Sequence, residues 1–406
     1  MKVIRVIGLM LIVLLFSACS GDSESSETKQ PTVISVYVFT PNKPIITRGD
    51  VGPVAPIDNT ENESLITKLQ IWVFNHDTGD LITYYSPESV ESLNGTSATG
   101  ATYQLSVSEA FAQAASKPQV DVYVIANVTQ ANCGLSFVEG TSRETLEAAL
   151  IQENYFGLTT LTDEVPADGL PMSGVQRGVT VSGSSPVYKL PENVVLTRAV
   201  SKIRFVFCRE APAEGQTDIP VTISSIKLNK GMIPKEEYLF LGTSVMTPPY
   251  PNYHVGSYEN TDVDDAKEFV VGDWVQKLEH IPTSEAPLQY IYQSQGAQEY
   301  EDLINSGLNK TVKNEQNEDV PAPELIQVGP YYLRESDQLL KGSITYQKQG
   351  EEPKEKEFKM AAAGDFSRNH TWIVYAYYSK SGLVAVMVVV KDWDAPTEKS
   401  HKVYNW

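Results

Sequence analysis

Short runs of apolar and β-branched residues, separated by turn residues, recur along most of the chain. Val33–Phe39 (VISVYVF) is apolar at nearly every position, and the runs 65–74, Leu81–Tyr85 and Gln119–Ala126 follow it. Runs of this length between Gly, Pro, Asn and Asp residues are typical of β-strands. The turn sequence NHDTGD predicts a hairpin over 65–85. The pattern predicts a β-rich fold whose first strand, apolar on both faces, needs burial on both sides.

The predicted strands continue into the second half, with one helical segment before them. Residues 143–156 place Leu146, Leu150 and Ile151 on one stripe behind Ser142, a potential N-cap, and so predict a helix. The polar stretch 294–324 predicts a long surface loop. Further strands are predicted at 101–108, 179–190, 194–208, 221–228, 237–241, 288–292, 339–347, 355–360, 371–378 and 383–392.

The length of the chain and the spacing of its strands predict two domains. A chain of 406 residues exceeds one ordinary domain. A boundary near Leu196 leaves about seven strands in each half, which suits a β-sandwich. We therefore expect an all-β protein with two β-sandwich domains in tandem, over 49–195 and 196–406, and a short helix in the first.

Composition and charge limit the kinds of partner and chemistry. Lys and Arg number 32 against 51 Asp and Glu, a formal net charge of −19, whereas nucleic acid and anionic lipid need clustered cations. Three Cys exclude a disulfide scaffold, and Cys133 and Cys208 are either two separate thiols or one disulfide. The five His lack metal-ligand spacing and no catalytic motif occurs. We therefore predict no metal, no cofactor, no nucleic-acid partner and no enzyme activity.

The first residues have the pattern of an export signal. Lys2 and Arg5 precede an apolar stretch, 6–16, that is shorter than a membrane span, and two small residues then precede Cys19. This arrangement looks like a bacterial lipobox, in which the Cys is acylated and becomes the new N-terminus. We expect residues 1–18 to be removed and Cys19 to carry the lipid that anchors the precursor.

Six short motifs occur in order along the rest of the chain. They are LQIWVFNHDTGDLITYY (69–85), VDVYVIANV (120–128), LPMSG (170–174), LTRAVSKIRF (196–205), RNHTWIVYAYY (368–378) and VMVVVKDW (386–393). With the lipobox before them and a terminal Trp406 after them, they resemble the Bacteroidetes fimbrillins, the subunits of type V pili. The resemblance implies two transthyretin-like β-sandwich domains and a structural role. It also implies a lipoprotein precursor in the cell outer membrane that becomes part of a fimbrium on the cell surface.

The resemblance further implies protease-triggered donor-strand exchange. An Arg-specific protease cuts the N-terminal loop and releases the first strand, and a C-terminal strand of the next subunit fills the vacated groove. Here the cut falls between Arg48 and Gly49, which makes 19–48 a lipidated propeptide. The donor tail is 394–406, which contains Val403, Tyr404 and Trp406. The implied partners are other copies of the chain or related pilus subunits, the protease, the outer membrane through the lipid, and host or bacterial surface ligands.

Other roles in the same system stay open. A tip subunit needs the groove but no donor tail, and an anchor subunit keeps its lipid. A carbohydrate-binding adhesive lipoprotein is a further alternative, because the segment 248–258 places tyrosines among turn residues, either to stack on sugars or to pack down. Since Arg48 and a tail ending on Trp406 are both present, the sequence favours the polymerising stalk subunit.

Overall fold

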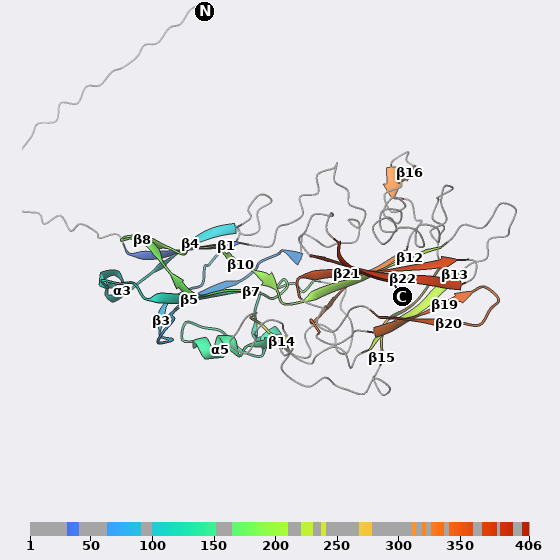
Figure 1. Cartoon of the computed structure of the whole chain (residues 1–406), viewed down its shortest axis with the longest axis horizontal. Helices are drawn as coiled ribbons and strands as arrows, with labels where there is room; N and C mark the ends of the chain where they lie inside the picture. Colours follow the sequence, from blue (N-terminus) through green and yellow to red (C-terminus); the bar gives the residue numbers. More distant parts are fainter. Residues whose placement is uncertain are drawn as a thin grey trace, which may run out of the picture. The chain divides into compact units, whose positions relative to one another are not determined.

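Strands make up nearly all of the regular structure, as predicted (Figure 1). The structure is a computed structural model. Several predicted features lie outside the described residues, namely Cys19, Arg48, Gly49, Trp406, the segment 248–258 and the strand at 288–292. The described residues are 31–39, 63–90, 100–151, 165–209, 221–229, 237–240, 268–277, 311–313, 319–321, 326–336, 341–359, 368–379, 382–392 and 400–405, some in the second half by their backbone alone.

The first strand, β1 (Val33–Phe39), lies in the interior of a five-stranded sheet. Its antiparallel neighbour β4 (Gly100–Ser106) pairs with it along its whole length. Two short parallel strands share its other edge, β9 (Val187–Lys189) beside its start and β10 (Val194–Val195) beside its end. The fifth strand, β8 (Ser182–Ser184), pairs with β9. We call this sheet the first sheet.

A second five-stranded sheet is antiparallel throughout and contains the predicted 65–85 hairpin. Its strands, in spatial order, are β11 (Thr197–Arg198), β7 (Met172–Thr180), β5 (Gln119–Ala126), β2 (Leu69–Asn75) and β3 (Leu81–Tyr85). Side chains of both sheets, such as Ile34, Leu105, Ile71 and Val122, belong to one buried cluster. The two sheets therefore enclose a common core, as in a β-sandwich.

The segment after β5 covers the other face of the second sheet. Gln70 and Trp72 of β2 donate hydrogen bonds to the carbonyl oxygens of Phe137 and Val138, at 2.9 and 3.1 Å. The Trp72 ring also meets the Phe137 ring edge-on, with 6.3 Å between centroids. Because both faces are covered, β2 is buried at six of its seven positions.

The helix predicted over 143–156 is much shorter in the structure. Helix α5 spans Arg143–Glu147, and the Ser142 hydroxyl accepts a hydrogen bond from the Thr145 amide at 3.2 Å, as the N-cap prediction required. Residues Leu150–Ile151 form strand β6, which pairs with β14 (Glu237–Tyr238). Pairing with a segment far along the chain therefore replaces the helix that the local pattern favours. Two further short helices were not predicted, α3 (Glu109–Gln113) and α4 (Gln130–Cys133).

The second half contributes two further sheets. The strands of the five-stranded sheet, in spatial order, are β18 (Ile326–Leu333), β12 (Ser201–Arg209), β21 (His370–Ser379), β22 (Gly382–Asp392) and β23 (Ser400–Asn405). Those of the four-stranded sheet are β15 (Glu268–Lys277), β13 (Val221–Asn229), β19 (Lys341–Lys348) and β20 (Lys354–Lys359). Ring contacts between Phe205 and Phe358 and between Tyr346 and Tyr378 join the two sheets, with centroids 6.0 and 5.5 Å apart.

Four strands of the second half, β15, β18 and a small hairpin of two, were not predicted from the sequence. The sequence pattern gave no strand for β15 or β18. The stretch 294–324, predicted as a loop, contains the small hairpin of β16 (Thr311–Lys313) and β17 (Asp319–Pro321). The tandem division into 49–195 and 196–406 stays a prediction.

Candidate functional site: the first strand and its neighbours

The buried face of β1 is formed by alternate aliphatic residues. Ile34, Val36 and Val38 are completely buried, and they belong to the same core cluster as Tyr103 and Leu105 of β4. Burying one such side chain is worth about 1.5–3 kcal/mol, so these three contribute roughly 4.5–9 kcal/mol to holding β1 in place. The first strand is thus a structural part of the core rather than an appended segment.

The opposite face of β1 is only half-buried, which corrects the prediction of burial on both sides. Ser35, Tyr37 and Phe39 are of intermediate exposure. The Tyr37 ring lies against Gly100 of β4, where an added Cβ would sit 2.8 Å from the ring and closer still to the Val38 carbonyl oxygen. Glycine at position 100 therefore allows β4 to approach β1 closely.

The backbone of β1 is bonded along both edges. Beyond the ladders, the Val33 amide donates to the Pro186 carbonyl at 2.8 Å and the Phe39 carbonyl accepts from the Leu196 amide at 3.0 Å. Among the described strands, β1 alone joins β4 to β9 and β10. Removing β1 would therefore leave unpaired backbone groups along the edge of β4 and along the edges of β9 and β10, with an apolar strip between them. An extended segment adds to a site of this kind.

The predicted donor residues occupy the far end of the chain. Val403 and Tyr404 lie in β23, where they stand opposite Val389 and Val388 of β22. In the order of the five-stranded sheet, β23 is the outermost strand and pairs with β22 alone among the described strands. Residues 400–405 of the tail thus form an edge strand in the sheet of their own chain.

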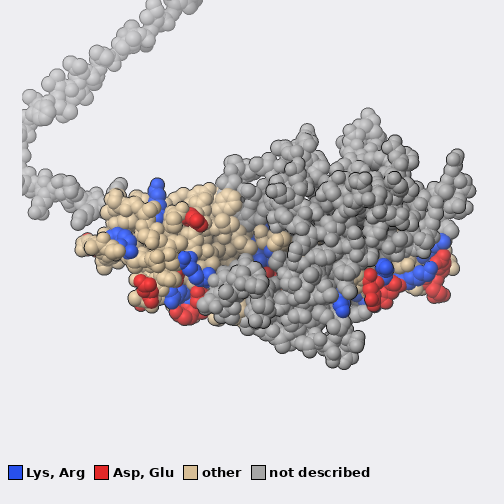
Figure 2. Space-filling model, in the orientation of Figure 1, with Lys and Arg blue, Asp and Glu red and all other residues tan. Residues whose placement is uncertain are grey.

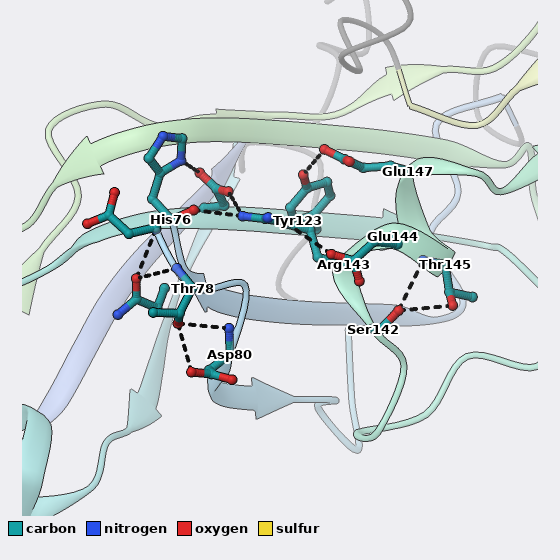
Figure 3. A network of polar contacts seen from close by, with 12 residues as sticks. His76, Thr78, Asp80, Tyr123, Ser142, Arg143, Glu144, Thr145 and Glu147 are labelled. Atoms are coloured by element: carbon teal, nitrogen blue, oxygen red, sulfur yellow. Dashed lines mark hydrogen bonds and ion pairs between the residues drawn. The ribbon is translucent and has the colours of Figure 1, made fainter.

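A buried carboxylate fastens the covering segment to the second sheet (Figure 3). Asp121 of β5 lies 2.7 Å from His76 Nδ1 and accepts hydrogen bonds from Arg143 at 3.0 Å and from the Gly178 amide at 2.7 Å. Arg143 also donates to the His76 carbonyl oxygen at 2.8 Å. Because Arg143 begins α5, these bonds hold the covering segment on the sheet, a structural role.

A second polar group beside it involves Tyr123. Its hydroxyl donates to Glu147 at 2.6 Å, and the Arg177 guanidinium lies 5.4 Å from the ring centroid. Burial and the hydrogen bond to Glu147 raise the pKa of Tyr123 well above its ordinary value. The hydroxyl therefore stays protonated and acts as a hydrogen-bond donor.

Cys133 is a buried thiol rather than part of a disulfide. Burial raises its pKa to about 12, so the reactive thiolate is scarce at neutral pH. Within the described residues, no group of three or more His, Cys, Asp or Glu side chains lies close enough together to hold a metal ion.

The described surface mixes charges of both signs. Figure 2 shows basic and acidic side chains next to one another on the described part of the face that it draws. At the β19–β20 hairpin, for example, Glu351 lies 3.1 Å from Lys348 and 2.8 Å from Lys354. No helix among the described residues has the length and apolar character to cross a membrane.

The first strand and its neighbours define a class of protein, a β-sandwich whose first strand is part of the core. A family comparison agrees with this class. Residues 52–223 match the family described as major fimbrial subunit protein (FimA). The match makes this part of the chain similar to fimbrial subunits and confirms the predicted resemblance. It supports a structural, non-enzymatic role as a subunit of a cell-surface fimbria that assembles with other pilus subunits.

Several solved structures are also similar to the chain. The tip fimbrial protein Mfa3 from Porphyromonas gingivalis, with a C-terminal truncation, is 12% identical, with 90% of this chain and 100% of that chain covered and a TM-score of 0.43. A fimbrilin (fimA) from P. gingivalis W83 is 11% identical, with 87% and 91% covered and a TM-score of 0.43. A fimbrial assembly protein from Parabacteroides distasonis is 14% identical, with 93% and 99% covered and a TM-score of 0.42. No curated protein matches the chain.

Proposed function

We propose that the chain is a polymerising pilus subunit that is activated by the loss of its first strand. The precursor reaches the outer membrane as a lipoprotein through Cys19. An Arg-specific protease cuts between Arg48 and Gly49, and residues 19–48 leave with β1. The tail 394–406 of the next subunit then fills the vacated place with Val403, Tyr404 and Trp406, and the fimbria grows by repetition.

The observation that carries this proposal is the position of β1 in the core. Its three completely buried side chains and its two paired edges mean that its loss creates a long, specific acceptor site. It also precedes the segment that contains Arg48, so one cut disconnects it from the rest of the chain. Exposed apolar surface together with unpaired backbone groups drives strand addition.

The place of the tail supports its role as the donor. As an outermost strand, β23 gives up one ladder when it leaves, whereas an interior strand gives up two. Strand addition to a neighbour restores main-chain hydrogen bonds on both edges of the tail. The exchange is therefore favourable in backbone hydrogen bonds as well as in apolar burial.

The roles of tip, anchor and carbohydrate-binding adhesin differ from this proposal in what they require. A tip subunit does not donate its tail, and an anchor subunit keeps Cys19 and β1. A carbohydrate-binding lipoprotein needs neither step to bind its ligand. Surface ligands on host or bacterial cells remain compatible with a stalk subunit as well.

The variant Arg48→Ala tests the proposal. Purified precursor is treated with an Arg-specific protease, and polymers are followed by electron microscopy and light scattering. The original chain should be cut before Gly49 and polymerise, whereas Arg48→Ala should stay uncut at this position and monomeric because its own β1 still occupies the site. Lys43→Ala, five residues before Arg48, is the matched control and should behave like the original chain. Polymers formed by uncut Arg48→Ala would overturn the mechanism.

A further inference from the structure

A buried acidic residue stands directly after the segment that contains the proposed cut. Glu63 is 1% exposed, and its carboxylate accepts hydrogen bonds from Lys202 at 3.0 and 3.2 Å and from the Tyr332 hydroxyl at 2.8 Å. Lys202 lies on β12 and Tyr332 on β18, so the start of the first half is bonded to a sheet of the second. Lys202 is 2% exposed and Tyr332 is completely buried.

A buried arginine of β11 extends the same group. Arg198, 1% exposed, donates to the Glu63 carbonyl oxygen at 3.0 Å and to the Ser64 hydroxyl at 3.1 Å. Its third contact, at 3.1 Å, is with the side-chain oxygen of Asn369, just before β21. Asn369 has a left-handed backbone, with φ of 57°, and its amide donates to the Val200 carbonyl at 2.8 Å. Together with Tyr332, four separate stretches of the chain therefore meet in this group.

We propose that Glu63, Ser64, Arg198, Lys202, Tyr332 and Asn369 form a clamp that confines the opening of the molecule to its first strand. The partners of Glu63 described above lie on β11, β12 and β18, none of them on the first sheet. Loss of β1 consequently breaks none of these bonds. The clamp fixes the chain at residue 63, so that β2, which begins six residues later at Leu69, keeps its place when β1 leaves.

Because the charges of the clamp are buried, the clamp strongly resists opening. A buried ion pair is costly to break by removing one partner, because the other charge then stays buried without compensation. Fraying that starts at β1 would have to expose Glu63 together with Lys202 before it could reach β2. The clamp goes beyond the proposed function, because it operates in the uncut chain whenever β1 opens by thermal motion.

Hydrogen exchange on the full-length, uncut chain tests the clamp without any protease. The variant Val36→Ala loosens β1 by shortening one completely buried side chain. In this background, faster exchange should be limited to β1 and its partners β4, β9 and β10. Adding Glu63→Gln should extend the faster exchange, by tenfold or more, to β2 and β12. The added variant Asp121→Asn is the matched control, a buried acid with a basic partner outside the clamp, and should leave β12 unchanged.

Two results would overturn the clamp. In one, Val36→Ala alone speeds exchange in β2 as much as in β1. In the other, Glu63→Gln leaves β12 at its original rate. Should Glu63→Gln fail to fold, the double variant Glu63→Gln with Lys202→Met removes both charges and should recover a folded chain, and failure of that recovery also counts against the clamp. Because no cut is involved, these outcomes are independent of whether Arg48 is the cleavage site.

Discussion

Single charged residues buried between strands stabilise this fold at specific points. Arg368 donates to Glu335 at 2.7 Å and to the carbonyl oxygens of Tyr238 and Leu239 at 2.6 and 2.9 Å. Beside it, one carboxylate oxygen of Glu237 accepts from the Glu335 amide at 3.0 Å, while the other is buried with no hydrogen-bond partner among the described residues. Glu237 is completely buried. Because one of its oxygens lacks a hydrogen bond within the described part of the chain, the charge of its carboxylate would be only partly compensated.

Glu237 should therefore make stability depend on pH. Burial raises its pKa from 4.5 to about 8, although Arg368 acts in the opposite direction. The folded chain binds this proton more tightly than the unfolded chain, so the stabilisation from this group is full below pH 4.5 and is lost as the pH rises towards 8. The variant Glu237→Gln should lose this part of the pH dependence and be more stable than the original chain at pH 8.5. Urea unfolding midpoints of both proteins at pH 5, 7 and 8.5 measure this pH dependence. Parallel profiles for the two proteins would contradict its assignment to Glu237.

Gly100 offers a second test at the scale of one residue. An added Cβ would collide with the Val38 carbonyl oxygen and the Tyr37 ring, so Gly100→Ala should destabilise the precursor by about 1–3 kcal/mol. Gly140→Ala is the matched control, because an added Cβ there meets nothing within 4 Å. Thermal and urea unfolding compare the two, and equal stability of both variants would mean that β4 does not need this close approach.

At the scale of elements, the strands with a clear apolar pattern could be predicted from the sequence. β1, β2, β5 and the 65–85 hairpin follow directly from their apolar runs and turn residues. The helix at 143–156 could not be predicted correctly, because Leu150 and Ile151 pair with a strand more than eighty residues away, and no local pattern contains that information. The predicted strands at 179–190 and 194–208 contain β9 and β10, the partners of β1 on its second edge, but their short lengths and their pairing with β1 were not predicted, because that pairing too is long-range.

The site shows the same division between local and long-range information. The apolar strand β1 was recognisable from sequence alone, whereas the loop around Arg48 stays a prediction. The clamp was not, although Arg198, Lys202 and Asn369 lie within motifs that carry the family resemblance. Basic residues inside otherwise apolar runs were the available signal, because such residues are buried only when they are paired. Their partner Glu63 belongs to a polar stretch and has no distinguishing pattern.

The tail is the element whose removal best separates the stalk role from the tip role. Deleting 394–406 removes β23, so a stalk subunit should remain folded and cleavable but unable to donate, and its fibres should stop growing. Each junction would otherwise bury Tyr404 and Trp406, worth about 1.5–3 kcal/mol for each large apolar side chain. Electron microscopy of cells that carry the deletion measures fibre length. Fibres of normal length would show that the tail is not the donor, as expected for a tip subunit.

At the scale of the whole molecule, the proposal requires the precursor to be held at the membrane before it is cut. Cys19 is the only Cys in the first hundred residues and follows two small residues at the end of an apolar stretch. Cys19→Ala should therefore abolish lipid labelling and release the precursor from the membrane fraction. Metabolic labelling with a palmitate analogue tests this. Ser17→Ala, which preserves the Cys, is the control and should keep the label, and label on Cys19→Ala would exclude the lipobox.

The central claim is that subunits assemble only after the first strand has gone. Mass spectrometry of fibres sheared from the cell surface tests it most directly, because it reports where the assembled chain begins. The proposed mechanism predicts an N-terminus at Gly49 and no peptide from 19–48. Assembled subunits that still contain Val33–Phe39 within the same chain would contradict it.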